Sequence, residues 1–363
     1  MKRCAEFVLT VLTMAVVASG AYLESDGDRP AIKPGPSVPP VRPAPDVHLP
    51  TLAQRVTVGA AHRWSGLTFY PLELPASHSV RRILTLDQAL QRGELTIREV
   101  GEGRVAHLEL RNDANLPVFL MAGELIVGGK QNRMVRNDVL LPRQSNWLEV
   151  EVYCGEQHRW KGSGGFKSGG TLSAPALRRM ASGGAGQDRI WGEIGSQLKA
   201  AEVESETANY QRFFENGERR RRLDSCVERL RPLPGPRTVG CVVVGHHRIV
   251  GCDLFDDPDL FASLWPKLSR SYGADVVLPR PPIDLYSKQR RIAPLSAKTV
   301  RRFLDRVGGA RFTRRPTPGS GKLWSVQGQV EGTSLEHFGG VIHASLFPAR
   351  MTIQPLPQPR IEE

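Results

Sequence analysis

The sequence predicts an α+β protein, and three observations support this fold class. Segments in which apolar and polar residues alternate, separated by turn residues, fill residues 63–160, as in a β-sandwich or β-barrel. Apolar residues recur at helical spacing in several segments of residues 161–348. A further hairpin pattern lies among these helices at residues 241–252. We therefore expect a β-rich N-terminal part packed with a helix-rich C-terminal part that contains a hairpin.

Composition and charge narrow the class of protein. Apolar residues make up 40% of the 363 residues and charged residues 24%, which are the values of a chain that folds around a packed core. The formal net charge is +12, but the cations are spread along the chain and are not interleaved with aromatic residues. The one dense cationic run, residues 219–222, falls on a predicted helix and is interpreted as its solvated face. We therefore expect no nucleic acid among the partners.

The N-terminus has the pattern of an export signal. Lys2 and Arg3 precede an apolar run at residues 5–18, and small residues follow where a signal peptidase would cleave, after Gly20 or Ala21. The run is shorter than the ~20 residues of a membrane-spanning helix. We therefore predict a signal peptide at residues 1–20, a secreted or periplasmic location, and no transmembrane span in the mature chain. An uncleaved signal anchor is the alternative.

The remaining divisions follow changes in composition. Residues 21–62 are rich in proline and lack apolar periodicity, so we expect a tether there. The folded domain is predicted at residues 63–348, with its β-rich part at 63–160 and its α+β part at 161–348. Residues 349–363 form a proline-containing tail.

The β-rich part is predicted to consist of strands that follow one another closely. The predicted strands are residues 67–72, 95–100, 105–110, 116–121, 125–127, 135–142 and 148–154. Thr85 as a hydroxyl cap and Gly93 as a stop delimit one short helix between the first two strands. Gly101 and Gly103 begin a G-x-G-x-x-A string, but alternation follows instead of a helix, so we predict a hairpin turn and no dinucleotide site.

We predict that the α+β part, residues 161–348, consists of helices with strands around them. Apolar stripes predict helices at residues 187–201, 204–215 and 223–230. Asp257 and Pro258 open another helix, which Pro266 is expected to kink, and Ser296 and Gly308 delimit the last one. Two final strands are predicted at residues 322–329 and 341–347.

The candidate site consists of two loops that follow apolar strands. Glycines let a ligand approach the backbone, consecutive N–H groups can form an anion-binding nest, and cations and amides add directed contacts. These loops therefore predict a site for a phosphate- or carboxylate-bearing ligand. The alternative is a structural turn, with Glu124 and Arg133 paired across a hairpin and the second loop a corner anchored by its tryptophan. The candidate ligand-binding residues are Glu124, Gly128, Gly129, Lys130, Gln131 and Arg133 in the first loop and Glu156, Arg159 and Trp160 in the second.

No catalytic motif matches the chain. Lys130 follows two glycines, but Glu124 stands where the first glycine of a P-loop belongs and Gln131 where its Ser or Thr belongs. A G-x-S-x-G nucleophile elbow is missing, and no histidine falls at a metal-ligand spacing that stands alone. We therefore expect neither a metal nor an organic cofactor, and the catalytic residues stay unknown.

An exported protein can form disulfide bonds, so the position of each cysteine in the predicted strands matters. In a symmetric hairpin that turns at His246 and His247, Cys241 and Cys252 face each other, which predicts a disulfide. The alternative is two buried thiols in a slightly different register. Cys154 shares the apolar face of its predicted strand, so we expect it to be buried and unreactive.

Five segments in the same order resemble a prokaryotic family, the ADP-ribosylglycohydrolase- and rhodanese-phosphatase-associated protein domain. The resemblance covers residues 64–347 and implies an association with ADP-ribose chemistry, but it supplies no catalytic residues to carry over. The segments are residues 127–133 (VGGKQNR), 154–160 (CGEQHRW), 190–194 (IWGEI), 250–255 (VGCDLF) and 265–272 (WPKLSRSY).

These observations give one leading functional hypothesis and two others. The leading one is an exported, non-catalytic binding or accessory domain that recognises an anionic small molecule or an envelope protein partner through the two loops. The alternative is an enzyme acting on an ADP-ribose-like, nucleotide-like or phosphorylated small molecule, with Glu124 or Glu156 as general base and Lys130 and Arg133 holding the anion. A purely structural envelope protein is the third.

Overall fold

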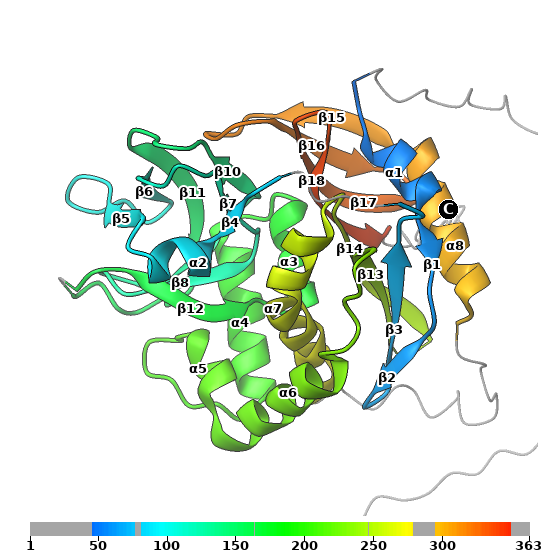
Figure 1. Cartoon of the computed structure of the whole chain (residues 1–363). Helices are drawn as coiled ribbons and strands as arrows, with labels where there is room; N and C mark the ends of the chain where they lie inside the picture. The colour runs from blue at the N-terminus through cyan, green and yellow to red at the C-terminus, as the bar shows by residue number, and fades with distance from the viewer. Residues whose placement is uncertain (1–45, 77–80, 163, 246, 279–294, 350–363) are drawn as a thin grey trace, which may run out of the picture. The chain divides into compact units, whose positions relative to one another are not determined.

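A large antiparallel sheet joins the beginning and the end of the folded domain (Figure 1). This computed structural model describes residues 46–76, 81–162, 164–245, 247–278 and 295–349. In these residues the sheet has nine strands in the order β1-β3-β13-β14-β18-β17-β16-β15, and β2 also pairs with β3. Its strands are β1 Thr57–Val58, β2 His62–Trp64, β3 Leu67–Glu73, β13 Thr238–Gly245, β14 Arg248–Leu254, β15 Arg311–Arg315, β16 Lys322–Gln327, β17 Val330–His337 and β18 Gly340–Pro348.

The β-rich part between β3 and the helices forms two smaller sheets. One has the order β10-β7-β4 and the other the order β12-β8-β9-β11-β6-β5. Their strands are β4 Leu84–Thr85, β5 Leu95–Glu99, β6 His107–Asn112, β7 Val118–Leu120, β8 Glu124–Val127, β9 Arg133–Val135, β10 Val139–Leu141, β11 Leu148–Cys154 and β12 Lys167–Leu172. Short alternating strands with close turns thus form the layered β structure that the sequence predicts.

The helices cover the sheets and fill the space between them. Their bounds are α1 Leu49–Arg55, α2 Leu86–Gln91, α3 Pro175–Ser182, α4 Gln187–Ala200, α5 Gln211–Glu215, α6 Gly217–Leu230, α7 Pro258–Val277 and α8 Ala297–Asp305, followed by the 3-10 turn Arg306–Gly309. Helices α1 and α8 pack on one face of the nine-stranded sheet. Helix α7 packs on the other face, where residues of β7, β10 and β12 join the same apolar cluster. The two β regions therefore share a core.

Local sequence signals explain where several helices begin. Thr85 accepts a hydrogen bond from the backbone of Gln88, and the Gln88 side chain accepts one from the backbone of Thr85, which is a complete capping box. Asp257 accepts hydrogen bonds from the first N–H groups of α7, and Pro258 occupies the first turn. The predicted starts of α2 and α7 are thereby confirmed.

Two boundaries differ from the sequence prediction. Helix α1 lies inside the predicted tether, yet Leu49 is fully buried and its backbone N–H donates to Glu336 at 2.9 Å. The core therefore begins before residue 63. The sequence did not indicate this, because a helix as short as α1 shows no extended apolar periodicity even when it packs on a sheet. The continuous helix predicted at residues 204–215 is wrong: only Gln211–Glu215 is helical, since Tyr210 and Phe213 are buried by a turn that brings them onto other helices.

The predicted signal peptide, the first part of the tether, the tail from residue 350 and His246 lie outside the described residues. Of the helices in the part that the structure describes, none combines the length and the apolar character needed to cross a membrane.

Candidate functional site

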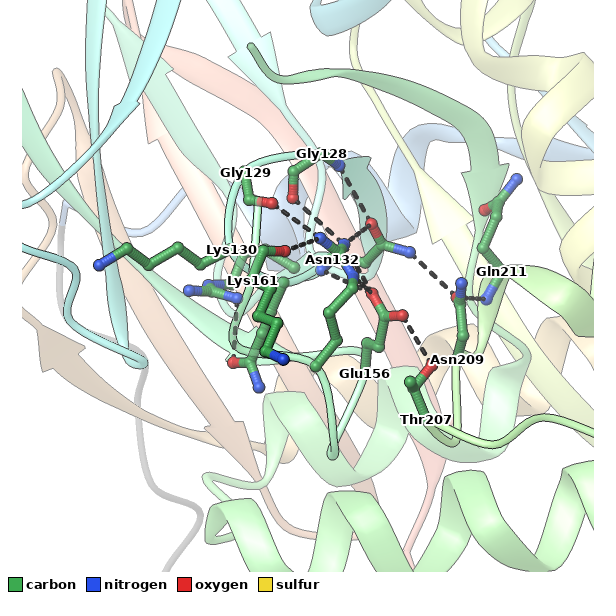
Figure 2. Close-up of polar contacts among 12 residues, drawn as sticks. Gly128, Gly129, Lys130, Asn132, Glu156, Lys161, Thr207, Asn209 and Gln211 are labelled. Atoms are coloured by element: carbon green, nitrogen blue, oxygen red, sulfur yellow. Dashed lines mark hydrogen bonds and ion pairs between the residues drawn. The ribbon is translucent and has the colours of Figure 1, made fainter. Parts of the chain in front are cut away.

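The two loops singled out in the sequence lie against each other. The first is the turn at residues 128–132 between β8 and β9, and the second, residues 155–160, follows β11. Strands β11 and β9 are paired, with Cys154 opposite Arg133 at the end of the pairing. The loops therefore leave the sheet side by side, and Gly128, Gly129 and Lys130 of the first come together with Glu156 of the second (Figure 2).

Arg159 joins the two loops. Its Nη1 donates to the carbonyl of Gly129 at 2.7 Å, and its Nη2 donates to the carbonyl of Gly128 at 3.4 Å and to Oδ1 of Asn132 at 3.1 Å. Its Nε donates to Oε2 of Glu156 at 2.8 Å. All three guanidinium nitrogens are engaged within the protein, so the side chain holds the loops together.

Glu156 is buried at the centre of this joint. Its Oε2 also accepts from the backbone of Asn132 at 3.3 Å, and its Oε1 accepts from the hydroxyl of Thr207 at 2.7 Å. Burial acts to raise the pKa of Glu156, but the hydrogen bonds from Arg159 and Thr207 outweigh it and the pKa is lowered. The Asn132 side chain donates onward to Asn209 at 3.0 Å, which ties the segment before α5 to the joint (Figure 2).

Backbone donors of the first loop are used inside the protein. Gly128 donates to the Asn132 side chain at 3.0 Å, and Gly129 donates to a backbone carbonyl in the segment before β12 at 3.2 Å. Lys130 donates from its backbone to the carboxylate of Glu99 at 3.0 Å. Because these acceptors already occupy the expected nest, the loop in this conformation is a closed structural turn.

The two glycines are required by chain packing. Gly128 and Gly129 have φ values of +124° and +52°, a region that residues with a Cβ rarely adopt. A Cβ on Gly128 would lie 2.4 Å from the carbonyl oxygen of Gly165, and one on Gly129 would lie 2.2 Å from the ring of Phe166. The close approach that glycine permits here is made by residues 165–166 of the chain itself.

Trp160 is the exposed part of the joint. Its side chain is 43% exposed, while Lys130 Nζ lies 5.4 Å and the Arg133 guanidinium 5.8 Å from its ring centroid. Lys130 Nζ also donates to the backbone carbonyl of Glu102 in the turn between β5 and β6. Cations thus hold the indole in place and leave part of it open to solvent.

Arg133 and Gln131 lie beneath this surface. Arg133 is fully buried, and it donates to Oε1 of Gln131 at 3.2 Å and to Oε2 of Glu99 at 3.4 Å. The same Gln131 oxygen accepts from the thiol of Cys154 at 3.1 Å. Burial lowers the pKa of Arg133 and raises the pKa of Cys154, which is inert, as its place on the core face predicts.

Glu124 belongs to a different cluster. It is fully buried, accepts from the backbone N–H of Met121 at 2.8 Å and pairs with Lys267 of α7 at 2.6 Å. Lys267 also pairs with Asp87 at 2.8 Å. Burial raises the pKa of Glu124, and Lys267 acts against that rise. The predicted pairing of Glu124 with Arg133 is wrong. Glu124 is the first residue of β8, whereas Arg133 of β9 pairs with Ile126, near the other end of β8.

Both carboxylates nominated as general bases are therefore held in ion pairs. Glu124 faces α7 and Glu156 faces Arg159, each with at most 3% of its surface exposed. A general base has to reach its substrate within hydrogen-bonding distance, and neither carboxylate is open to one. In this arrangement both carboxylates serve as internal partners of cations.

The predicted disulfide between Cys241 and Cys252 is not present in this structure. The hairpin β13–β14 has a register shift after Val243, so that Cys241 lies opposite Asp253 and Val242 opposite Cys252. Residues one step apart in register point to opposite faces of a sheet. Cys241 packs with α7 and Cys252 with the cluster under α1 and α8, and both thiols are free. The alternative of two buried thiols is the arrangement found.

A fully buried polar chain was missed in the sequence. His343 Nδ1 lies 2.7 Å from Asp138 and its Nε2 lies 3.0 Å from Asp253. Arg178 forms an ion pair with Asp253, and the hydroxyl of Tyr272 donates to the same carboxylate at 2.6 Å. Burial acts to raise the pKa of Asp253, but the two cations lower it well below its usual range. This series of hydrogen bonds and ion pairs connects the nine-stranded sheet to α3, α7 and the β-rich part.

Its members come from segments that no motif connects. Asp138 precedes β10, Arg178 lies on α3, Asp253 on β14 and His343 on β18. The available signal was a charged or titratable residue inside an otherwise apolar strand pattern, at Asp253 and at His343. All are at most 2% exposed, so the chain stabilises the core and does not reach a ligand. Within the described ranges, no group of three or more His, Cys, Asp or Glu side chains is arranged to hold a metal ion.

The model of one protein family matches most of the chain. It is the ARG and Rhodanese-Phosphatase-superfamily-associated Protein domain, and it matches residues 55–347. The chain belongs to this family, which confirms the resemblance carried by the five sequence segments. The match begins at the last residue of α1, ahead of the predicted domain start. Comparison with curated proteins gave no match, and comparison with solved structures gave none.

Proposed function

We propose that the chain is an exported binding or accessory module that recognises an acidic segment of a partner protein. The contact region is the surface formed by Trp160, Lys130 and Lys161, called the Trp160 surface below. One observation carries the proposal: a tryptophan that is 43% exposed stands on a joint whose other polar groups are engaged internally. Rigid exposed tryptophans are frequent anchors of protein interfaces.

The internal contacts favour a protein over a small anion at this place. The N–H groups of Gly128, Gly129 and Lys130 and the guanidinium of Arg159 all have acceptors in the protein. A small anion would have to displace those acceptors. A partner protein needs only the outward indole face and the exposed Lys161 beside it, and these groups are left open.

The charges around the indole indicate an acidic partner. Lys130 Nζ lies 5.4 Å from the ring centroid, and Lys161 is exposed directly after the tryptophan. Gly103, in the turn between β5 and β6, packs so closely that a Cβ there would lie 3.2 Å from both Lys130 and Trp160. The surface is thus built from three segments and carries positive charge, which speeds association with acidic partners.

Export is the second component of the proposal, and it rests on the sequence alone. Lys2 and Arg3, the apolar run at residues 5–18 and the small residues before Ala21 together support it. In an exported protein, the partner would be a protein of the cell envelope or of the medium.

Site-specific photo-crosslinking tests the partner. Trp160 is replaced by p-benzoylphenylalanine in the full-length chain, expressed in its own host, and adducts are identified after irradiation. Phe338, which is 54% exposed at the β17–β18 turn, gives a matched control position. We expect one protein adduct from position 160 that position 338 does not give.

A charge-reversed variant makes the test specific. Lys130→Glu, combined with the crosslinker at position 160, is expected to remove the adduct while the melting temperature stays within a few degrees of that of the parent. The adduct should contain an acidic segment at the crosslinked peptide. The proposal is overturned by equal adducts from positions 160 and 338, or by an adduct that survives Lys130→Glu.

A further inference from the structure

A polar cavity lies between the turn that joins α3 to α4 and the nine-stranded sheet. Its volume is about 610 Å³, which is in the range of small-molecule sites. The turn between α3 and α4 forms one wall and strands β15, β16 and β17 form the other. The side chains that matter for recognition are Arg179, Arg189, Arg315, Thr313, Ser325 and Glu331.

Three arginines line this cavity, and only one has a carboxylate partner. Arg179 pairs with Glu331 at 2.6 Å and donates to the carbonyl of Pro348 at 2.8 Å. Arg189 is exposed, and in the described part of the chain neither it nor Arg315 forms an ion pair. The cavity therefore holds an excess of two positive charges.

Arg315 is fixed at the rim of the cavity. Its Nη1 donates to the carbonyl of Ser182 at 3.3 Å, at the end of α3. Burial and the nearby cation of Arg136 lower the pKa of Arg315, so an anion beside it would be stabilised. The side chain is thus a half-buried guanidinium whose remaining donors have room for an acceptor.

The wall opposite the sheet is a glycine-rich turn that leads into a helix. Ser182 is followed by Gly183, Gly184, Ala185 and Gly186, and α4 then runs for 14 residues. Gly186 is its N-cap and provides no side-chain hydrogen bond to the first turn. Ser182 to Ala185 line the cavity, whereas Gly186 and the first helical residue, Gln187, lie outside its lining.

The turn is held rigidly against β11. The hydroxyl of Tyr153 donates to the carbonyl of Ala185 at 2.8 Å, and the Gln187 side chain makes hydrogen bonds to both backbone groups of Cys154. Asp188 lies in the first turn of α4 but does not line the cavity. The site is therefore formed in advance.

We infer that this cavity, called the arginine cavity below, binds a small organic phosphate. Arg189 on one wall and Arg315 on the other provide forked donors for phosphate oxygens. The hydroxyls of Thr313 and Ser325 offer contacts to the rest of the ligand. This site is separate from the Trp160 surface, and it can exist whether or not that surface binds a protein.

Binding of pyrophosphate to the mature chain tests the inference. Affinity is measured by titration calorimetry, with succinate as the dicarboxylate control. Arg189→Ala removes one exposed cation, and Arg229→Ala, an exposed arginine of α6 outside the cavity, is the matched control. We expect pyrophosphate to bind, Arg189→Ala to weaken it about tenfold or more, and Arg229→Ala to leave it unchanged.

A second variant separates binding from folding. Gly186 has an extended backbone, and a Cβ there meets no atom within 4 Å, so Gly186→Asp can adopt the native conformation. Aspartate caps the helix and should preserve or raise the melting temperature, while its negative charge, next to the lining residue Ala185, should repel a bound anion. Pyrophosphate affinity should fall about tenfold in this variant. The inference is overturned if wild type binds no pyrophosphate, if succinate binds equally well, if either cavity variant keeps wild-type affinity, or if Arg229→Ala weakens binding equally.

Discussion

The Nδ1 atom of His343 lies 2.7 Å from the carboxylate of Asp138, although 205 residues separate the two in the sequence and both side chains are fully buried. The other ring nitrogen faces the carboxylate of Asp253 at 3.0 Å. Burial acts to lower the pKa of His343, but the two carboxylates raise it to about 9. The imidazole is therefore a cation in the folded protein at neutral pH.

This pKa predicts the direction of the pH dependence of stability. His343 has a higher pKa in the folded state than its ordinary value of 6.5, so its contribution is complete below pH 6.5 and is lost as pH rises through about 9. The loss is on the order of 3 kcal/mol. Urea unfolding between pH 6 and pH 10 measures it. His343→Gln should be less stable at pH 6.5 and should lack most of the decline, whereas a decline of equal size in that variant would assign it to other groups.

The ion pair between Glu124 and Lys267 gives a prediction that separates a structural from a catalytic carboxylate. Glu124→Gln leaves Lys267 with only the half-exposed Asp87, and we expect a loss of about 3 to 5 kcal/mol in the free energy of unfolding. The double variant Glu124→Gln with Lys267→Met removes the unpaired charge and should recover part of that loss. Urea unfolding measures the stability of both variants. If Glu124→Gln alone is as stable as wild type, the buried ion pair is contradicted.

The two-loop joint predicts opposite results for neighbouring cations. Arg159→Ala removes the contacts to Gly129, Asn132 and Glu156, and we expect it to cost about 2 to 3 kcal/mol. Lys130→Ala removes a half-buried side chain at the edge and should change stability by less than about 1 kcal/mol. Thermal unfolding compares the two. If the two variants have the same melting temperature, Arg159 does not hold the loops together.

Local patterns made much of the fold predictable. The alternating strands, the capping box at Thr85 and the cap at Asp257 depend on residues a few positions apart, and these signals act in the same way in any chain. The closed turn at Gly128 and Gly129 was also open to prediction as the structural alternative. What the sequence left undecided was whether the two loops meet.

Long-range partners and register were not predictable. The partner of Glu124 lies 143 residues away on α7, and no spacing rule connects the two. In the hairpin, a single bulge after Val243 moves Cys241 and Cys252 to opposite faces, and such a bulge has no reliable local signal. The helix predicted through residues 204–215 failed for a similar reason, because tertiary contacts of Tyr210 decided the backbone.

The proposed export predicts a defined mature N-terminus. A fusion of residues 1–62 to alkaline phosphatase, which is active only after oxidation outside the cytoplasm, should be active in a bacterial host. Mass spectrometry of the full-length protein should show cleavage after Gly20 or Ala21. Replacing residues 8–12 by a charged stretch is the control and should abolish the activity. An active fusion of full precursor mass would indicate the signal anchor instead.

The thiols give the last prediction, because burial raises the pKa of every cysteine in the described residues. The pKa of Cys226 is raised to about 12, and those of Cys241 and Cys252 lie well above their usual range. We therefore expect none of the cysteines of the mature chain to react with maleimide while the protein is folded, and all four to react in urea. Intact mass spectrometry counts the additions, with protein recovered from the exporting host. A mass lower by two hydrogens would show that two of the cysteines form a bond, and a disulfide-linked peptide containing Cys241 and Cys252 would show that the hairpin adopts the symmetric register. Full labelling only after unfolding would show that they remain on opposite faces even in an oxidising compartment.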